Sequence, residues 1–311
     1  MPIENAQEFL DLNWPKEGFS IGSPTFRFFD SSADKTRSEI TKLLINGENI
    51  KGDLELEGFT KLETLDCREN QLTSLKIIGS PNLKFLDCSG NKITKLDVSS
   101  SPDLEKLNCS SNLLTNLDLS QNKKLEDLVI SNNDFSAQDL SFLSHLVNLR
   151  LLFLGNWETN HLGNFDTYNR FTGSLEPLKN LTELKELEIS NTNIDSGLQH
   201  LPFSLESLII SNFGEVDNFE PKIRTLETEL KEHGEPDNND FAPLFVKWRI
   251  ARAKELEAKF QELQTAKRNF QYFSIFSCLL LAIISLIWIS NGRGIEQRKK
   301  KLISRKVNFS F

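Results

Sequence analysis

Residues 62–124 repeat one pattern three times, as LETLDCRENQLTSLKIIGSPN (62–82), LKFLDCSGNKITKLDVSSSPD (83–103) and LEKLNCSSNLLTNLDLSQNKK (104–124). In every copy apolar residues, a Cys and an Asn recur at the same offsets, 21 residues apart. Apolar and polar residues alternate around Leu65 and Cys67, which predicts a short strand with one inward face. One such unit cannot bury that face alone, so the period predicts coils that stack into a solenoid.

The same apolar spacing continues before and after these three copies. It begins with a degenerate coil at Ile40 and returns around Leu128, Leu152, Leu187 and Leu208, so we expect about eight strands in a repeat domain over residues 40–220. Polar and aromatic residues interrupt the pattern over 156–178, which predicts an insertion. Insertions in solenoids form loops on one face, and this one is expected either to bind a partner or to cover the strands.

The pattern LxxLxLxxNxL, with Cys at the second inward strand position, resembles the leucine-rich repeat family. This resemblance implies an α/β solenoid, a horseshoe whose concave side is lined by short parallel strands. It also implies that the outward residues of those strands are the recognition surface. The Asn that follows each strand is expected to satisfy backbone groups where the coil turns.

Outward strand positions supply the candidate partner-binding residues. The middle strands bring Val129, Leu151 and Phe153 together, with Asp127 on one side and Glu188 on the other. An apolar centre with a charged rim is typical of a binding hot spot. The complete predicted set on the concave face is Arg68, Phe85, Asp87, Lys106, Asp127, Val129, Leu151, Phe153, Glu188 and Ile209.

The charge and composition of the chain argue against nucleic-acid binding and catalysis. The chain has a net charge of −8, but residues 1–220 contain 19 Lys and Arg against 34 Asp and Glu. An acidic repeat region argues against a nucleic-acid partner. The four His residues lie far apart in the repeat order, and no phosphate-binding loop or nucleophile motif occurs. We therefore expect no catalytic residues, no cofactor and no enzymatic activity.

Three of the four cysteines occupy equivalent positions in successive repeats: Cys67, Cys88 and Cys109. A metal site is the alternative to a structural role, but this spacing lacks the close Cys pairs of zinc sites. The cysteines are expected to form a ladder of buried thiols, with no metal bound.

Outside the repeats the composition divides the chain further. We expect an N-terminal cap over 1–39, a C-terminal cap and linker over 221–243, and a charged amphipathic helix over 244–268 that offers a face for self-association. Residues 269–292 carry no charge. Their 18-residue apolar centre would span about 27 Å, which predicts a single transmembrane helix. A basic tail, 293–311, follows.

These features predict a non-enzymatic, membrane-anchored scaffold that binds a protein partner through the concave face. The thiol ladder and the absence of a leader sequence at the N-terminus favour repeats on the cytosolic side of a single-pass membrane protein. The alternative is a cell-surface or lumenal receptor with a short cytosolic basic tail. Glycosylation at Asn180 would favour that alternative.

Overall fold

A computed structural model describes residues 5–16, 35–156, 168–210, 224–234 and 241–267. The chain divides into two units, Met1–Trp248 and Arg249–Phe311, and the first contains the repeats. In chain order, with η for 3-10 helices, the elements are α1 (Ala6–Asn13), η1 (Arg37–Glu39), β1 (Lys42–Leu44), β2 (Lys51–Glu57), β3 (Thr64–Asp66), β4 (Gln71–Ile78), β5 (Phe85–Asp87), β6 (Lys95–Asp97), β7 (Lys106–Asn108), β8 (Asp127–Val129), η2 (Ser141–Leu143), β9 (Leu151–Phe153), β10 (Thr172–Ser174), η3 (Glu176–Leu178), β11 (Glu186–Glu188), β12 (Asn193–Ser196), η4 (Leu198–His200), β13 (Ser207–Ile209), α2 (Arg224–Lys231) and α3 (Ala242–Lys267).

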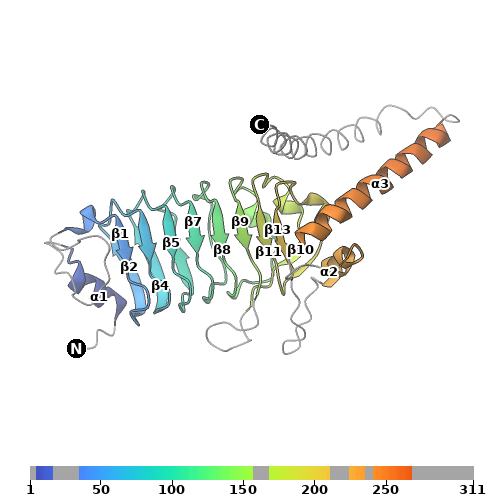
Figure 1. Cartoon of the computed structure of the whole chain (residues 1–311). Coiled ribbons are helices and arrows are strands. Elements are labelled where there is room, and N and C mark those ends of the chain that lie inside the picture. Colours follow the sequence, from blue (N-terminus) through green and yellow to red (C-terminus); the bar gives the residue numbers. More distant parts are fainter. Residues whose placement is uncertain (1–4, 17–34, 157–167, 211–223, 235–240, 268–311) are drawn as a thin grey trace, which may run out of the picture. The chain divides into compact units, whose positions relative to one another are not determined.

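Eight of these strands form one parallel sheet in the order β1-β3-β5-β7-β8-β9-β11-β13 (Figure 1). The register aligns the repeats, since Leu65 pairs with Leu86 and Leu86 pairs with Leu107. All three side chains are buried in a core that continues from coil to coil. The predicted solenoid of parallel strands is therefore confirmed.

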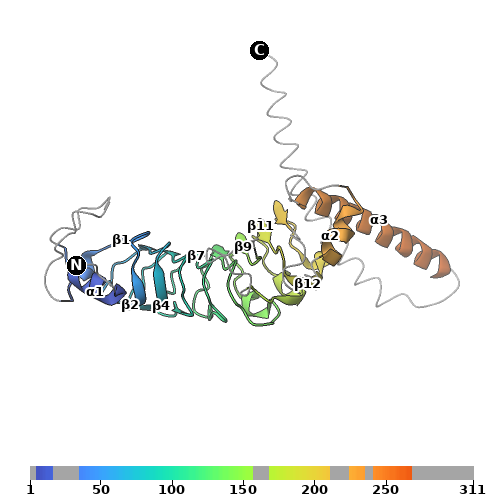
Figure 2. The same cartoon turned by 90° about the horizontal axis from the view of Figure 1, so that it is seen from below.

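The opposite side of the coils differs from the α/β class that was predicted. There β2, β4 and β6 form a second parallel sheet, β10 pairs with β12, and the later coils add η2, η3 and η4. Figure 2 shows β2, β4 and β12 along one side of the stack and β1, β7, β9 and β11 along the other. Extended backbone advances about 3.3 Å per residue and a helix only about 1.5 Å, so a coil of about 21 residues closes with extended segments rather than helices.

A ladder of buried Asn side chains joins successive coils, as the sequence predicts. The side-chain amide of Asn91 donates to the carbonyls of Cys67 and Cys88, at 3.1 and 3.0 Å. Its side-chain oxygen accepts from the backbone N–H of Leu72 at 3.0 Å. Equivalent bonds recur one coil apart, and they satisfy backbone groups that the turns would leave unpaired. The members with this pattern are Asn70, Asn91, Asn112, Asn133 and Asn169.

Two hydrogen-bonded Asn residues mark the ends of the insertion, Asn156 before it and Asn169 where the repeat resumes. Counting from β9 places Trp157 in the ladder position, but Asn169 occupies it, donating to the carbonyls of Ile130 and Leu154 at 2.8 and 2.9 Å. The side chain of Asn156 bonds both the N–H and the carbonyl of Asn169, at 2.7 and 3.1 Å. The repeat therefore resumes at Asn169, earlier than the expected end of the insertion at 178. Residues 157–167 lie outside the described part of the chain.

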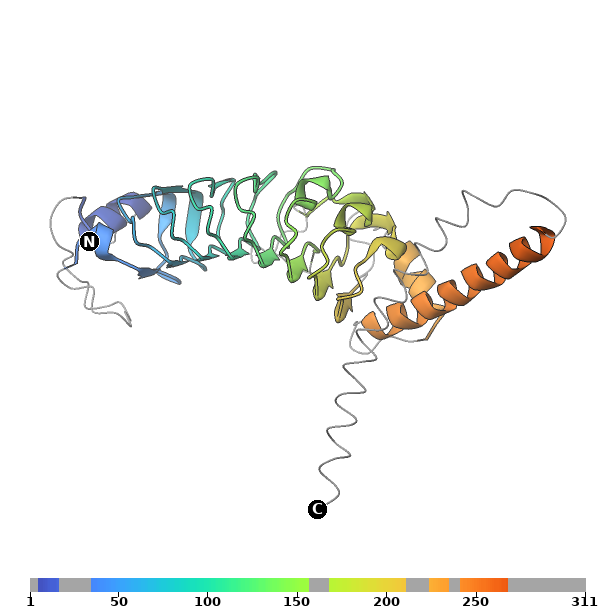
Figure 3. The same cartoon turned by 90° about the horizontal axis from the view of Figure 1, so that it is seen from above.

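Both ends of the repeat core are covered. Helix α1, in dark blue beside the N-terminus, lies at the first coil (Figure 3). Phe9, Leu10 and Trp14 of this segment are buried in the core. At the last coil, Leu244 and Trp248 are buried, and Phe241, directly before α3, donates its N–H to the carbonyl of Leu208 at 2.6 Å. The first turns of α3 thus belong to the C-terminal cap, although the sequence placed the cap and the charged helix in separate segments.

None of the helices in the described ranges is long and apolar enough to cross a membrane. The predicted span, 269–292, and the basic tail, 293–311, both lie outside those ranges, so the span stays a prediction.

Candidate functional site

The outward surface of the eight-stranded sheet, here called the strand face, contains the predicted site. Its side chains come from the first and third residues of each strand, which alternate with the buried middle residue. First positions hold Phe85, Lys106, Asp127 and Leu151, third positions hold Asp87, Val129, Phe153, Glu188 and Ile209, and Arg68 lies two residues beyond β3.

Strand register brings three of the apolar residues together. Val129 of β8 pairs with Phe153 of β9, and Leu151 lies on the same strand as Phe153 with Asp127 opposite it. All three apolar side chains are half-buried, so each exposes part of its surface. We call Val129, Leu151 and Phe153 the apolar patch. Ile209 lies two strands from Phe153, with β11 between them.

The N-terminal members of the predicted set do not join this patch. Phe85 lies on β5, so that β7 and β8 separate it from β9. Next to it, the Lys106 ammonium group forms an ion pair with the carboxylate of Asp127 on the neighbouring strand. The hydrogen bond within this pair raises the pKa of Lys106. Arg68 is exposed and lies 3.5 Å from the carboxylate of Asp66. Apart from Phe85, the predicted residues in this part of the strand face are charged.

Two predicted surface charges are instead buried. Asp87 is 5% exposed, and its carboxylate accepts from the backbone N–H and the hydroxyl of Ser89 at 3.0 and 2.6 Å. The amide of Asn108 also donates to it, at 3.2 Å. Glu188 is fully buried. The prediction that Asp87 and Glu188 present charge to a partner is corrected, because both carboxylates are occupied by hydrogen bonds within the protein.

Glu188 links three coils. Its carboxylate accepts from the backbone N–H of Ser190 at 2.7 Å, from the N–H of Gly155 at 2.9 Å and from the hydroxyl of Ser131 at 3.4 Å. Burial raises the pKa of Glu188, although these hydrogen bonds oppose the shift. A Cβ atom at Gly155 would lie 2.2 Å from the Glu188 carboxylate, so only glycine leaves room for this arrangement.

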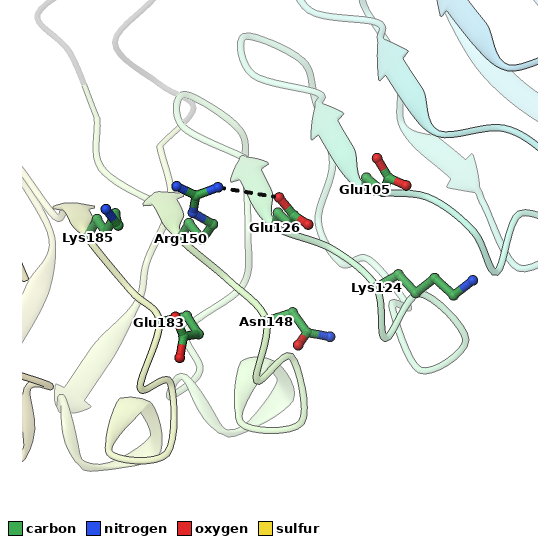
Figure 4. Close-up of a pocket in the computed structure, with 7 residues that line it drawn as sticks. All are labelled: Glu105, Lys124, Glu126, Asn148, Arg150, Glu183 and Lys185. Atoms are coloured by element: carbon green, nitrogen blue, oxygen red, sulfur yellow. Dashed lines mark ion pairs between the residues drawn. The ribbon is translucent and has the colours of Figure 1, made fainter. Parts of the chain in front are cut away.

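A hollow of about 480 Å³ lies at the amino-terminal ends of the strands beside the patch. Figure 4 shows its side chains, which come from the segments that lead into the strands. Arg150 and Glu126 form an ion pair across it at 3.8 Å. We call this the charged hollow, and it is lined by Glu105, Lys124, Glu126, Asn148, Arg150, Glu183 and Lys185.

The charged hollow was not predicted from the sequence. The predicted site residues all come from outward strand positions or the turn after β3, whereas the hollow residues lie one and three positions before the strands. The sequence feature that could have indicated the hollow is a charged residue directly before the strand in successive repeats, such as Glu105, Glu126, Arg150 and Lys185.

The cysteine ladder lies inside the solenoid rather than on the strand face. Cys67, Cys88 and Cys109 are free thiols, and all three are buried. Burial raises the pKa of each thiol, which makes them poor nucleophiles. Among the described residues, no group of three or more His, Cys, Asp or Glu side chains could hold a metal ion.

A family model described as leucine-rich repeats (2 copies) matches residues 60–101 and 81–122. Residues 60–122 are leucine-rich repeats. The comparison with curated proteins gave no match.

Several solved structures are similar to the chain. Internalin C2 from Listeria monocytogenes is 22% identical with a TM-score of 0.41, and the match covers 61% of this chain and 83% of that one. The functional domain of InlJ from the same species, which includes a cysteine ladder, is 23% identical with a TM-score of 0.36, over 60% and 45% of the two chains.

The leucine-rich repeat ectodomain of the Arabidopsis receptor kinase HAESA, in complex with an IDA peptide hormone, is 24% identical with a TM-score of 0.39. That match covers 57% of this chain and 31% of the receptor chain. The present chain therefore spans less than half of the HAESA and InlJ chains. At these identities the similarity concerns the fold alone.

Proposed function

We propose that the chain is a non-enzymatic scaffold that binds a protein partner through the strand face and is anchored to a membrane by residues 269–292. The observation that carries the binding proposal is the apolar patch. Val129, Leu151 and Phe153 are large apolar side chains that stay partly exposed on a sheet whose other outward positions are mainly polar. Apolar side chains at the centre of a polar surface supply most of the free energy of binding in protein interfaces.

Charge substitutions in the patch test the binding proposal. Full-length protein is used to capture partners from an extract of its source cells, and the captured proteins are measured by quantitative mass spectrometry. Phe153→Asp and Val129→Asp should each remove the same specific partners, because a carboxylate in the interface core would be desolvated without a counter-charge.

Thr64→Asp is the matched control, since Thr64 is also a half-buried outward residue of the sheet but lies on β3, away from the patch. It should retain the partners. Circular dichroism must show that all variants fold. Partners that bind the patch variants as well as the wild type would contradict the proposal.

The membrane anchor is tested separately. We expect the full chain to resist extraction from membranes at alkaline pH, and a chain that ends at Lys267 to be released. For the proposed cytosolic orientation, protease added outside sealed vesicles, on their cytosolic side, should digest the repeats without detergent. Protection of the repeats would instead support the receptor with lumenal or extracellular repeats.

A further inference from the structure

We propose that the partner binds with a large apolar side chain on the apolar patch and a Lys or Arg side chain in the charged hollow. This inference rests on the proposed function, since it specifies the chemistry of a protein partner for the same strand face. It adds the residues of the hollow to the binding site, with Glu105 and Glu183 as the groups that receive the cation.

The charged hollow continues from the apolar patch along the same strands. Arg150 directly precedes Leu151 at the start of β9, and Glu126 directly precedes Asp127 at the start of β8. Extended backbone rises about 3.3 Å per residue, so about 10 Å of strand separates Phe153 from Arg150. One short partner segment can span this length, because about 10 Å is three residues of extended chain or two turns of a helix.

The charged hollow is lined by three carboxylates and three cations, but two of these cations pair with carboxylates outside it, which leaves a surplus of carboxylates within it. Lys124 pairs with Asp103 at 2.7 Å, and Lys185 pairs with Glu206 at 3.1 Å, and neither of these carboxylates lines the hollow. The third lining cation, Arg150, pairs with Glu126.

Each lining cation thus has a carboxylate partner of its own. By contrast, within the described ranges no ion pair reaches the carboxylates of Glu105 and Glu183. At the border of the patch, exposed Glu186 on β11 adds a further carboxylate without an ion pair among those residues. Because opposite potentials meet across protein interfaces, this surplus favours a basic partner segment and disfavours an acidic one.

The net charge of the repeat region also favours a basic partner segment, since residues 1–220 contain 19 Lys and Arg against 34 Asp and Glu. Such an excess of negative charge accelerates association with basic segments and slows association with acidic ones. The apolar patch then provides the contact that holds the partner, because surface charge pairs contribute little affinity on their own.

A random peptide library displayed on phage, selected against the full-length protein, tests this chemistry without knowledge of the natural partner. We expect the enriched peptides to combine a large apolar residue with Lys or Arg three residues away, or about seven residues away in helical peptides. Enrichment of acidic or uncharged peptides, or of none, would overturn the proposal.

Substitutions then locate the cation. A synthetic peptide of an enriched sequence is titrated against wild-type protein and against the double variant Glu105→Gln, Glu183→Gln. Each change keeps the shape of the side chain and removes its charge. We expect the affinity to fall by about fivefold and to depend less on salt concentration, as the loss of up to two partly exposed charge contacts requires.

Glu63→Gln is the matched control, because exposed Glu63 lies directly before β3, in the same repeat position but outside the charged hollow. It should leave the affinity unchanged. If Phe153→Asp abolishes binding while the double variant binds like the wild type, the cation site is wrong and the proposed function stands. If neither change affects binding, both proposals are wrong.

Discussion

At the scale of single residues, the Asn ladder is what fixes each coil against the next. Asn112 donates to the carbonyls of Cys88 and Cys109, at 3.0 and 3.1 Å, and accepts from the N–H of Ile93 at 2.9 Å. All of these groups are buried, so removal of the side chain leaves several backbone groups without partners. The ladder is therefore a stability determinant.

Asn112→Ala should lower the free energy of unfolding by about 2–4 kcal/mol, because buried backbone groups then lose their hydrogen bonds. Urea unfolding followed by circular dichroism measures this change. Asn116→Ala is the control, since Asn116 is exposed and bonds only to the hydroxyl of its neighbour Thr115, at 3.3 Å. Equal losses in the two variants would contradict the structural role of the ladder.

Glu188 predicts a specific dependence of stability on pH. Burial raises its pKa in the folded protein above the ordinary value of about 4.3. A carboxyl group of this kind contributes stability below its unfolded pKa, and that contribution is lost as pH rises through the folded pKa. As pH rises across this window, the unfolding free energy of the wild type should therefore fall relative to that of Glu188→Gln. A difference that is constant or grows with pH would contradict it.

Sequence reasoning succeeded at this scale where the repeat is regular and failed where it is interrupted. The spacing predicted the backbone role of Asn70, Asn91 and Asn112, because each lies at the same offset from its strand. It missed Asn169, since counting from β9 leads to Trp157. A usable signal was present, because Asn169 precedes Phe171 by two residues, just as Asn133 precedes Phe135.

The burial of Glu188 had no such signal. Alternation along β11 predicts an outward side chain, and that is its direction at the backbone. The carboxylate becomes buried because Gly155 on the neighbouring coil leaves space for it, which is a contact between residues 33 positions apart. Contacts of this kind follow from packing between coils and cannot be read from a pattern within one repeat.

At the scale of elements, the first turns of α3 close the last coil of the solenoid. Phe245 is 1% exposed, its ring stacks on Trp248 at 6.0 Å between ring centroids, and both belong to the repeat core. The charged composition that begins at Lys247 led us to expect a separate helix from residue 244. The sequence could not show that one continuous helix serves both parts, because its apolar residues Leu244, Phe245 and Trp248 match no repeat position.

Phe245→Ala should open the C-terminal coils, because loss of a fully buried aromatic side chain costs about 3–5 kcal/mol. Hydrogen–deuterium exchange should then become faster in β13 and β11, with little change in β3 and β5, since each coil contacts only its neighbours. Val246→Ala provides the control, as Val246 is 51% exposed. Unchanged protection of β13 in Phe245→Ala would show that α3 is not part of the cap.

At the scale of the whole molecule, the repeats build one continuous parallel sheet that presents the apolar patch and the charged hollow side by side. The 21-residue period and the strand positions could be predicted from the sequence, because every coil satisfies the same packing rule. Which outward residues remain accessible could not, since exposure depends on neighbouring coils. Of the ten predicted residues, Val129, Leu151 and Phe153 form a contiguous surface, whereas Asp87 and Glu188 are buried.

Site-specific photo-crosslinking tests most directly the claim that a protein partner binds the strand face. A photoreactive phenylalanine analogue is placed at Phe153, or at exposed Lys76 on β4 of the opposite sheet, in the full-length chain. We predict a covalent adduct with a specific partner from position 153 and none from position 76. An adduct from position 76 with none from position 153 would contradict the account.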